Sequence, residues 1–445
     1  MLREELGVLQ ALVAELQEAL RKNSSNSSRP PSTDAKKRGR SGAKKPSGKK
    51  RGAQPGHPKH ERALLPVGDV DRVVRLVPDA CGGCGGPLVG RDPSPRRRQV
   101  SELPPLRPHV TEYQLHALDC AACRVRTWAP LPAEARFGVG PGVDAIVGTL
   151  TGVCRLSKRT TAEVLGDAFG VPLSVGGVIG CQKRVGDALA APAEEAKVFA
   201  KRQRRKHSDE TPWRQGELKG YLWTLVTPLV VVFTIAARRS SEVAKSVLGP
   251  VLGILHTDRY AGYAWWATSA RQVCWAHLVR DVRAIAERGA DSARVGNALL
   301  AETERMFGWW KRVKAGELSR RSFHVYMRGL RTRVEGLLEG GTRCAHPKTA
   351  RTCQNLLAAR AALWTFVTHE GVEPTNNAAE QALRFAVLWR KMSYGTHSMH
   401  GSRFVERLLT TYMTLRRQKR SVLGFLREAC CAHRAGRSPP SLVPS

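Results

Sequence analysis

Two aspartates of this 445-residue chain stand where carboxylates could do chemistry. Asp209 lies in "RRKHSDETPW", where a dense basic run ends abruptly in two acids, and Asp258 lies in "GILHTDRYAGY", directly after an apolar stretch. A lone aspartate at the edge of an apolar strand can be an ordinary turn residue. Brought together, however, carboxylates supply the hard oxygen ligands of Mg²⁺. Two such ions about 3.5–4 Å apart support phosphodiester cleavage without a protein nucleophile.

The stretches around the two aspartates predict the elements that must position them. "KHSDET", "YLWTLVTP" and "LVVVFTIAA" are rich in strand formers, "SSEVAKSVL" follows as a helix, and "GILHTD" returns as a strand. In this β-β-β-α-β order Asp209 lies on the first strand and Asp258 at the end of the fourth. Ligands bind at the carboxyl ends of strands in sheets flanked by helices, so this order brings the two side chains together. Glu210 is expected on the opposite face of its strand, away from the chemistry.

A third acid is available at Glu380, in "EPTNNAAEQALRFAVLWRK". Taken locally, Asn377 and Glu380 form a capping box, with Asn377 as the N-cap and Glu380 at the N3 position. Glu380 can join the aspartates only if its side chain faces the sheet. The residues around it leave both roles open.

Cationic and imidazole side chains near these acids are candidates for DNA contact. Arg384, Arg390 and Lys391 follow the third acid on the same predicted helix, where they either hold DNA or form a solvated face. His277, in "RQVCWAHLVRDV", could approach a scissile phosphate or serve only the structure. The sequence does not choose between these roles.

Two Cys-x-x-Cys pairs, "CGGC" and "CAAC", predict a zinc site. Cys81, Cys84, Cys120 and Cys123 can close a tetrahedron of thiolates around one structural Zn²⁺, with glycines allowing the tight turn of the first pair. The alternative is two unrelated redox or buried pairs. The chain has 11 cysteines, an odd number, and its start lacks the features of a secretory signal. A disulfide framework is therefore not expected, and the cytoplasm fits best.

Charge indicates the partner. The formal net charge is +34, and nine of these positive charges lie in the acid-free run 36–51. The rest of the chain stays strongly basic, which predicts a polyanion partner, most simply nucleic acid. No apolar run is long enough to predict a membrane span.

The first residues predict an amphipathic helix. Its apolar residues repeat every seven positions in two offset series: Leu2, Leu9, Leu16 and Leu6, Val13, Leu20. This is a short leucine-zipper seam that would pair two or more copies, or alternatively one face of a helix that docks on its own protein.

Further along, 143–190 predicts two helices around a Gly-Val-Pro turn, the second capped by Ser174. Their spacing fits either a helix-turn-helix that contacts DNA or a plain helical connector.

The chain is therefore expected to be a multidomain α/β protein. The segments that we predict are a coiled coil at 1–22, a disordered basic linker at 23–62, a zinc-binding domain at 63–135, a helical segment at 136–192, a catalytic domain at 193–415 with a helical insertion at about 278–372, and a C-terminal helix and tail at 416–445.

Several motifs in order resemble one known family. "SDETPW", "LHTDRYAGY", "CWAHLVRD" and "PTNNAAEQALR", together with "NSSNSSRPPS" and the cysteine pairs, resemble the transposases of the insertion sequence 66 (IS66) family. The resemblance implies a ribonuclease H-like mixed sheet with an Asp-Asp-Glu triad on Asp209, Asp258 and Glu380, a zinc-ribbon-like domain and a leucine zipper. The chain departs from the family at Gln381, where arginine is usual, and at the glycines 176–177 of the predicted DNA-reading helix.

The resemblance also implies an activity and its partners. Two Mg²⁺ ions on the triad would support cleavage at the ends of a bacterial mobile element and strand transfer into target DNA. Homo-oligomers, helper proteins of the same element and association with the nucleoid are expected. The competing hypothesis is a zinc-dependent DNA-binding protein or regulator without catalysis. A plain nuclease shares the triad.

Overall fold

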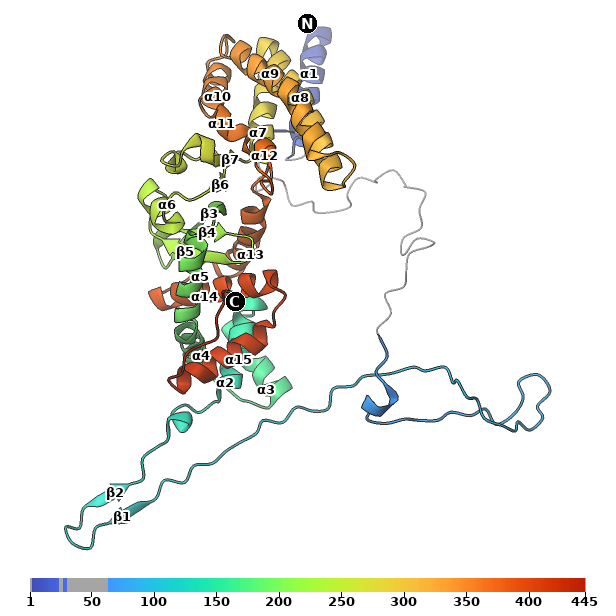
Figure 1. The fold of residues 1–445 in the computed structure, drawn as a ribbon, viewed down its shortest axis with the longest axis vertical. Coiled ribbons are helices and arrows are strands. Elements are labelled where there is room, and N and C mark those ends of the chain that lie inside the picture. Colours follow the sequence, from blue (N-terminus) through green and yellow to red (C-terminus); the bar gives the residue numbers. More distant parts are fainter. Residues whose placement is uncertain (1, 24–26, 30–62, 445) are drawn as a thin grey trace. The chain divides into compact units, whose positions relative to one another are not determined.

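The computed structural model describes residues 2–23, 27–29 and 63–444 (Figure 1). The chain divides into two units, Lys36–Pro108 and the remainder, Met1–Ala35 with His109–Ser445. The predicted basic linker at 23–62 lies almost entirely outside the described residues. None of the helices that the structure describes is long and apolar enough to cross a membrane.

A five-stranded mixed sheet lies in the larger unit, in the spatial order β5-β4-β3-β6-β7. Its strands are β3 (Arg205–Gln215), β4 (Leu218–Val226), β5 (Val231–Ala236), β6 (Ile254–Thr257) and β7 (Arg271–Val273). The first three strands form an antiparallel meander, and β6 and β7 run parallel to β3. Helix α6 (Ser241–Leu248) connects β5 to β6, so the predicted β-β-β-α-β order is confirmed.

One helix covers the β5 edge of this sheet. Along α14 (Met399–Arg417), Glu406, Thr410 and Thr414 recur at every fourth residue and therefore lie on one face. Their oxygens accept the N–H groups of Ile235, Phe233 (3.0 Å) and Val231 (3.0 Å), which alternate along β5. The helix thus satisfies the unpaired donors of the edge strand and blocks further strand pairing.

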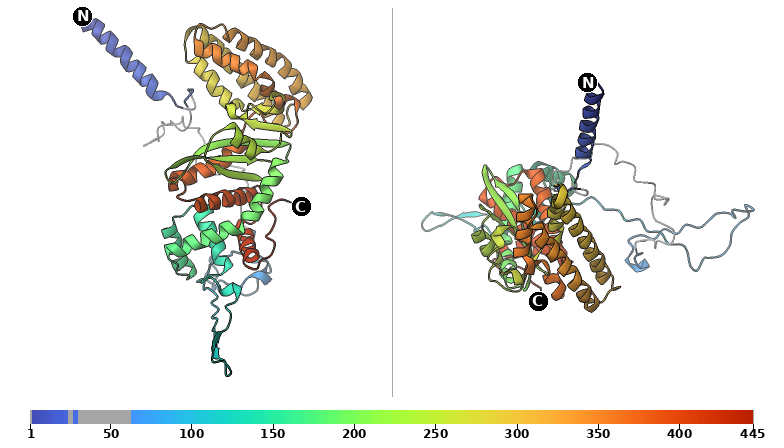
Figure 2. Two further views of the ribbon diagram at one scale, coloured as in Figure 1. Left: turned by 90° about the vertical axis from the view of Figure 1, so that its left-hand side faces the viewer. Right: turned by 90° about the horizontal axis from the view of Figure 1, so that it is seen from above.

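The segment between β7 and α13 (Asn377–Ser393) is helical and has its own core. Its helices are α7 (Trp275–Ala286), α8 (Ala290–Lys314), α9 (Arg320–Gly341), α10 (Pro347–Ala358), α11 (Arg360–Leu363) and α12 (Thr365–Thr368). Buried side chains such as Phe323, Leu330 and Phe366 form a cluster separate from the one around the sheet. Figure 2 shows these helices grouped together at one end of the sheet. A helical insertion was predicted for this stretch.

The helices that precede the sheet begin and end at residues that favour helix caps. They are α2 (Pro141–Gly148), the π-helical turn η4 (Thr149–Val153), α3 (Lys158–Phe169), α4 (Val175–Ala188) and α5 (Ala190–Lys201). Ser174 Oγ accepts the N–H of Gly177 at 3.0 Å, so the predicted cap of α4 is confirmed. Gly170, at φ 63°, ends α3 in the left-handed conformation.

A small third core joins α2, α3 and α4 through Val147, Leu165, Val178 and Cys181. The C-terminal helix α15 (Val422–Arg434) packs against α2 and α4. The helical segment is therefore tied to the end of the chain and not only to the sheet that follows it.

Each cysteine pair lies in a tight turn, and the two turns share a geometry. The N–H of Cys81 bonds the carbonyl of Gly86, and that of Gly85 bonds the carbonyl of Cys81. Cys120 does the same with Val125 and Arg124, inside the hairpin of β1 (Ala117–Asp119) and β2 (Arg126–Trp128).

The first turn lies in the smaller unit, together with the short η2 (Val67–Asp69), and the second lies in the larger unit. The remaining 3-10 turns are η3 (Ala133–Ala135), η5 (Ala261–Tyr263) and η6 (Thr268–Ala270).

The N-terminal segment is the single helix α1 (Leu2–Arg21). Leu9, Val13, Leu16 and Leu20 are exposed, with Leu20 at 85% of its full accessible surface. Within the described part of the chain, no other residues bury this apolar stripe.

Candidate active site

Asp209 lies in the middle of β3, on the face of the sheet toward α13. Its Oδ1 accepts the N–H of Glu210 at 2.9 Å. Burial and, after it, the negative charges of Glu210, Asp258 and Glu380 together raise the pKa of the Asp209 carboxyl to about 8. The charges of Asp258 and Glu380 therefore both act on Asp209, although the donor atoms of these three acids do not all lie within 4.8 Å of one another.

Asp258 follows β6 directly, at the carboxyl end of that strand. Its Oδ1 accepts the N–H of Tyr260 at 2.9 Å, which closes a turn of the kind aspartate favours. The side chain stays partly accessible, at 24% of its full surface. One oxygen is thus occupied by the turn, and the other faces Arg239 and the solvent side of the site.

Glu380 lies in the first turn of α13, but it does not cap that helix. The N-cap is Asn376, and no side chain completes a cap there, so the capping-box interpretation is wrong. Asn376 instead donates its amide to the carbonyl of Ser208 at 2.8 Å and contacts His207 Nδ1 at 3.1 Å. Because Asn376 is held by β3, the helix begins one residue earlier than predicted and Glu380 turns toward the sheet.

Cys274 and His277 both lie beside the Glu380 carboxylate. The Cys274 Sγ lies 3.7 Å from Glu380 Oε1, and His277 Nδ1 lies 3.4 Å from the same oxygen. Burial raises the pKa of the Cys274 thiol to about 11, so the thiol keeps its proton and donates it toward the carboxylate. Burial lowers the pKa of His277, and its Nδ1 has no hydrogen-bond partner among the described residues.

A further acid, Glu210, is buried beside the site and bound on two sides. Its oxygens accept the hydroxyl of Tyr263 at 2.6 Å and the Nε of Arg239 at 2.6 Å. Arg239 stacks on the Tyr260 ring at 3.8 Å and places Nη2 3.9 Å from Asp258 Oδ2. Glu210 is on the opposite face from Asp209, as predicted, yet it reaches the site through Arg239.

The sequence analysis missed this network because Arg239 is one of 72 lysines and arginines. The two tyrosines of "DRYAGY" were the available signal. They follow Asp258 closely and must pack near it, so a hydroxyl that needed an acceptor could have pointed to the neighbouring acid.

The three basic residues predicted to contact DNA differ in whether other residues of the chain already bind them. Arg384 and Lys391 are exposed on α13. Arg390 is already engaged, since its Nη1 donates to the hydroxyl of Thr211 at 2.9 Å and to the carbonyl of Pro212. It fastens α13 to β3, so Arg384 and Lys391 are the better candidates for DNA contact.

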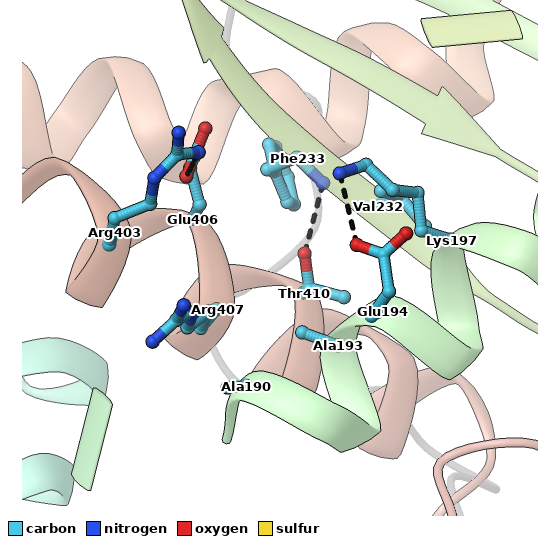
Figure 3. A pocket seen from close by; sticks show the side chains of 10 residues that line it. All are labelled: Ala190, Ala193, Glu194, Lys197, Val232, Phe233, Arg403, Glu406, Arg407 and Thr410. Carbon is cyan, nitrogen blue, oxygen red and sulfur yellow. Dashed lines mark hydrogen bonds and ion pairs between the residues drawn. The ribbon is translucent and has the colours of Figure 1, made fainter. Parts of the chain in front are cut away.

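One pocket is lined by none of these acids. It has a volume of about 370 Å³ and opens between α5, β5 and α14 (Figure 3). Four of its charges are paired with each other, Lys197 with Glu194 at 3.2 Å and Arg403 with Glu406 at 2.8 Å, and Arg407 is bound by groups outside the pocket. Groups neutralised in this way have little capacity for acid–base or metal chemistry, so the pocket is not the candidate site.

The donor set of the acid site fits hard divalent cations. Asp209 and Asp258 each have one oxygen not used by the backbone bonds above, and the mutual repulsion of the acids favours a bound cation or a bound proton. The one group of three ligand-type side chains whose donor atoms lie within 4.8 Å in the described part of the chain is Cys274, His277 and Glu380. Its protonated thiol argues for a hydrogen-bonded support of Glu380.

The zinc hypothesis gains local support. In each pair the first thiol, that of Cys81 or Cys120, has its pKa lowered by N–H groups of the same turn, so the thiolate that zinc needs is favoured. The site that would use all four cysteines stays a prediction.

Comparison with known families gives two matches. The family model of the IS66 transposases matches residues 157–403, more than half of the chain. A family of unknown function, DUF6444, matches residues 2–63. No curated protein matches the chain.

Proposed function

Because the chain belongs to the IS66 family of transposases, we propose that it cuts DNA at the ends of an insertion sequence and joins the freed 3′-hydroxyl to target DNA. The observation that carries this proposal is that Asp258 and Glu380 both lie near enough to Asp209 for their charges to raise its pKa, in addition to the larger effects of burial and Glu210. The sheet order β5-β4-β3-β6-β7, with three antiparallel strands followed by two parallel ones, supports a ribonuclease H-like core.

Asp209, Asp258 and Glu380 would hold two Mg²⁺ ions through their free carboxylate oxygens. When bound, the ions supply charge stabilisation for the attacking and the leaving oxygen of the phosphodiester. Asp209 must give up its proton to become a ligand, and solvent beside the partly exposed Asp258 can take it. No side chain forms a covalent bond to DNA in this scheme.

The surrounding residues keep these ligands in place. Cys274 donates to Glu380, Asn376 ties the start of α13 to β3, and Glu210 anchors Arg239 beside Asp258. Arg239 carries a positive charge into the acid cluster, where a phosphate would meet it. Its proposed role is to orient that phosphate.

DNA binding is proposed for surfaces outside the acid cluster. Arg384 and Lys391 lie exposed on the helix that carries Glu380. Helices α3 and α4 would contact the element ends as a helix-turn-helix, and the acid-free run 36–51 would bind phosphates without sequence preference. The four cysteines would hold one Zn²⁺ that stabilises the domain between them.

Assembly would use the exposed apolar stripe of α1. Its leucines recur at heptad spacing, and pairing two copies would bury them. Two protomers can then hold the two ends of one element, with helper proteins of that element as further partners.

The test is strand cleavage on labelled DNA that carries the flanks of the gene. Purified protein with Mg²⁺ or Mn²⁺ is compared with the Asp258→Asn variant on a sequencing gel. We expect discrete metal-dependent nicks at the flanks that the variant lacks, with DNA binding equal in both proteins. Equal binding without nicks from either protein, even with the helper proteins added, would support the non-catalytic DNA-binding alternative.

A further inference from the structure

A short polar segment that follows α1 contains a serine with almost no accessible surface. Ser27 is 1% exposed, although the surrounding sequence "NSSNSSR" is polar throughout. Its N–H and its hydroxyl both donate to the carbonyl of Asn23, at 2.9 and 2.6 Å. Buried serines need such bonds, because an unpaired hydroxyl is costly away from water. Ser27 is therefore tied to Asn23, close to the end of α1.

The next residue of that segment binds a distant helix. Ser28 donates its N–H to Glu287 Oε1 at 2.8 Å and its hydroxyl to Oε2 at 2.6 Å. Both oxygens of one carboxylate are thus taken by one residue that lies 259 positions away in the chain. Hydrogen bonds to an ionised acceptor are stronger than neutral ones, and two of them fix the direction as well as the distance.

The position of Glu287 suits it to accept hydrogen bonds from Ser28. It is the C-cap residue of α7, the helix that begins beside the candidate active site and leads into the helical insertion. An acid at a helix C-terminus is unfavourable to the helix itself, since that end carries partial negative charge. Its presence there calls for another reason, and the two donors of Ser28 supply one.

We propose that residues 27–29 form a docking segment, which fastens the N-terminal helix to the helical insertion by binding Glu287. This role goes beyond the proposed transposase activity, and it gives a function to part of the N-terminal region that matches a family of unknown function. The partner is the same chain, and the recognised chemistry is a carboxylate that accepts two donors from one serine.

Docking has a structural consequence for α1. The apolar residues of that helix are exposed, with Leu9 at 60% and Leu16 at 58%. A helix on an unattached tether could pair at many positions, whereas a helix fixed at its C-terminal end projects from one place on the insertion. The docking segment therefore determines where a second copy can bind.

Hydrogen–deuterium exchange on the full-length protein tests this. Amides of the peptide 22–30 are followed by mass spectrometry in the wild type, in Glu287→Ala and in Glu304→Ala. Glu304 is an exposed acid on α8 of the same insertion, so its removal matches the change in charge without touching the dock. We expect wild-type exchange in this peptide to be slower than in an unstructured chain by roughly ten- to a hundredfold, as bonds to a charged acceptor allow.

Glu287→Ala should abolish this protection, and Glu304→Ala should keep it. Ser28→Ala should weaken it, while Ser28→Thr, which retains both donors, should restore it. Unchanged exchange in the peptides of α8 and α9 verifies that the insertion still folds. Unprotected exchange in the wild type, or protection that survives both Glu287→Ala and Ser28→Ala, would overturn the proposal. Neither outcome depends on DNA cleavage.

Discussion

Two aspartates of this protein, the buried Asp144 and the half-buried Asp209, have opposite surroundings. Asp144, on α2, has no accessible surface and receives Arg184 Nη2 at 2.7 Å, Arg184 Nε at 3.1 Å, and Arg434 from α15. Asp209, on β3, has Glu210, Asp258 and Glu380 as the charges that raise its pKa, which rises to about 8. Asp144 is bonded directly to two cations, whereas Asp209 forms no ion pair with the described residues, and Arg239 pairs with its neighbour Glu210 instead.

The difference separates stability from function. A buried charge is tolerated when partners neutralise it, and removing one of those partners leaves the remaining charge without compensation. In a cluster where acids outnumber cations, the excess negative charge opposes folding, and a bound cation or proton relieves it. The Asp144 site joins the helical segment to the C-terminal helix, whereas the Asp209 site is where we propose catalysis.

The largest expected effect is the loss of cleavage in Asp209→Asn. The change removes a proposed ligand and one of several repelling charges. We expect the cleavage rate to fall on the order of 10³-fold or more, while the free energy of unfolding stays unchanged or rises by about 1 kcal/mol. Single-turnover cleavage and urea unfolding on the same preparation measure the two effects. Comparable losses of activity and stability would remove the contrast with Asp144.

The second effect is a loss of stability in Asp144→Asn. The guanidinium groups of Arg184 and Arg434, which both lie over the Phe137 ring, would then face a neutral amide in place of their counter-charge. We expect the free energy of unfolding to fall by about 3–5 kcal/mol. Urea unfolding followed by circular dichroism measures it, with Asp187→Asn, at an exposed carboxylate of α4, as the matched control. Wild-type stability in Asp144→Asn would mean that the pairing contributes little.

Local patterns predicted the elements and two of the acids. The alternation and apolar content of 204–258 predicted the strand order, and that order placed Asp209 beside Asp258. The cap at Ser174 followed from residue type alone. These features depend on neighbours in the sequence or on general rules of sheet topology, and a single sequence carries both.

Contacts between distant segments could not be predicted in this way. Asn376 captures the backbone of β3 and so moves the start of α13, which reversed the local preference for a cap at Asn377. Arg239 lies in the loop between β5 and α6, and no sequence periodicity predicts that this loop brings it to Glu210. The role of α14 depends on oxygens spaced to match the N–H groups of β5, and that match is visible only once the two elements lie side by side.

The smallest expected effect is the pH dependence of stability without Mg²⁺. The Asp209 carboxyl has a pKa of about 8 in the folded protein and 3.8 as its ordinary value. Between these values the folded state binds a proton that the unfolded state has released. Stability therefore falls as the pH rises through this window, by at most about 1.4 kcal/mol per pH unit for one proton, and levels off above it.

Urea unfolding at pH 5, 6, 7 and 8, without Mg²⁺ and without a chelator that would strip zinc, measures this slope. His207 and His256 act in the opposite direction at the acid end, because burial lowers their pKa values to about 4 and about 3. Asp209→Asn keeps both histidines, so the difference between the two proteins isolates the carboxyl. Added Mg²⁺ favours the ionised form and should flatten the wild-type slope, while the variant should not respond. A wild-type slope equal to that of the variant would mean that Asp209 ionises near its ordinary pKa, and the proposed electrostatic difference between the two sites would be lost.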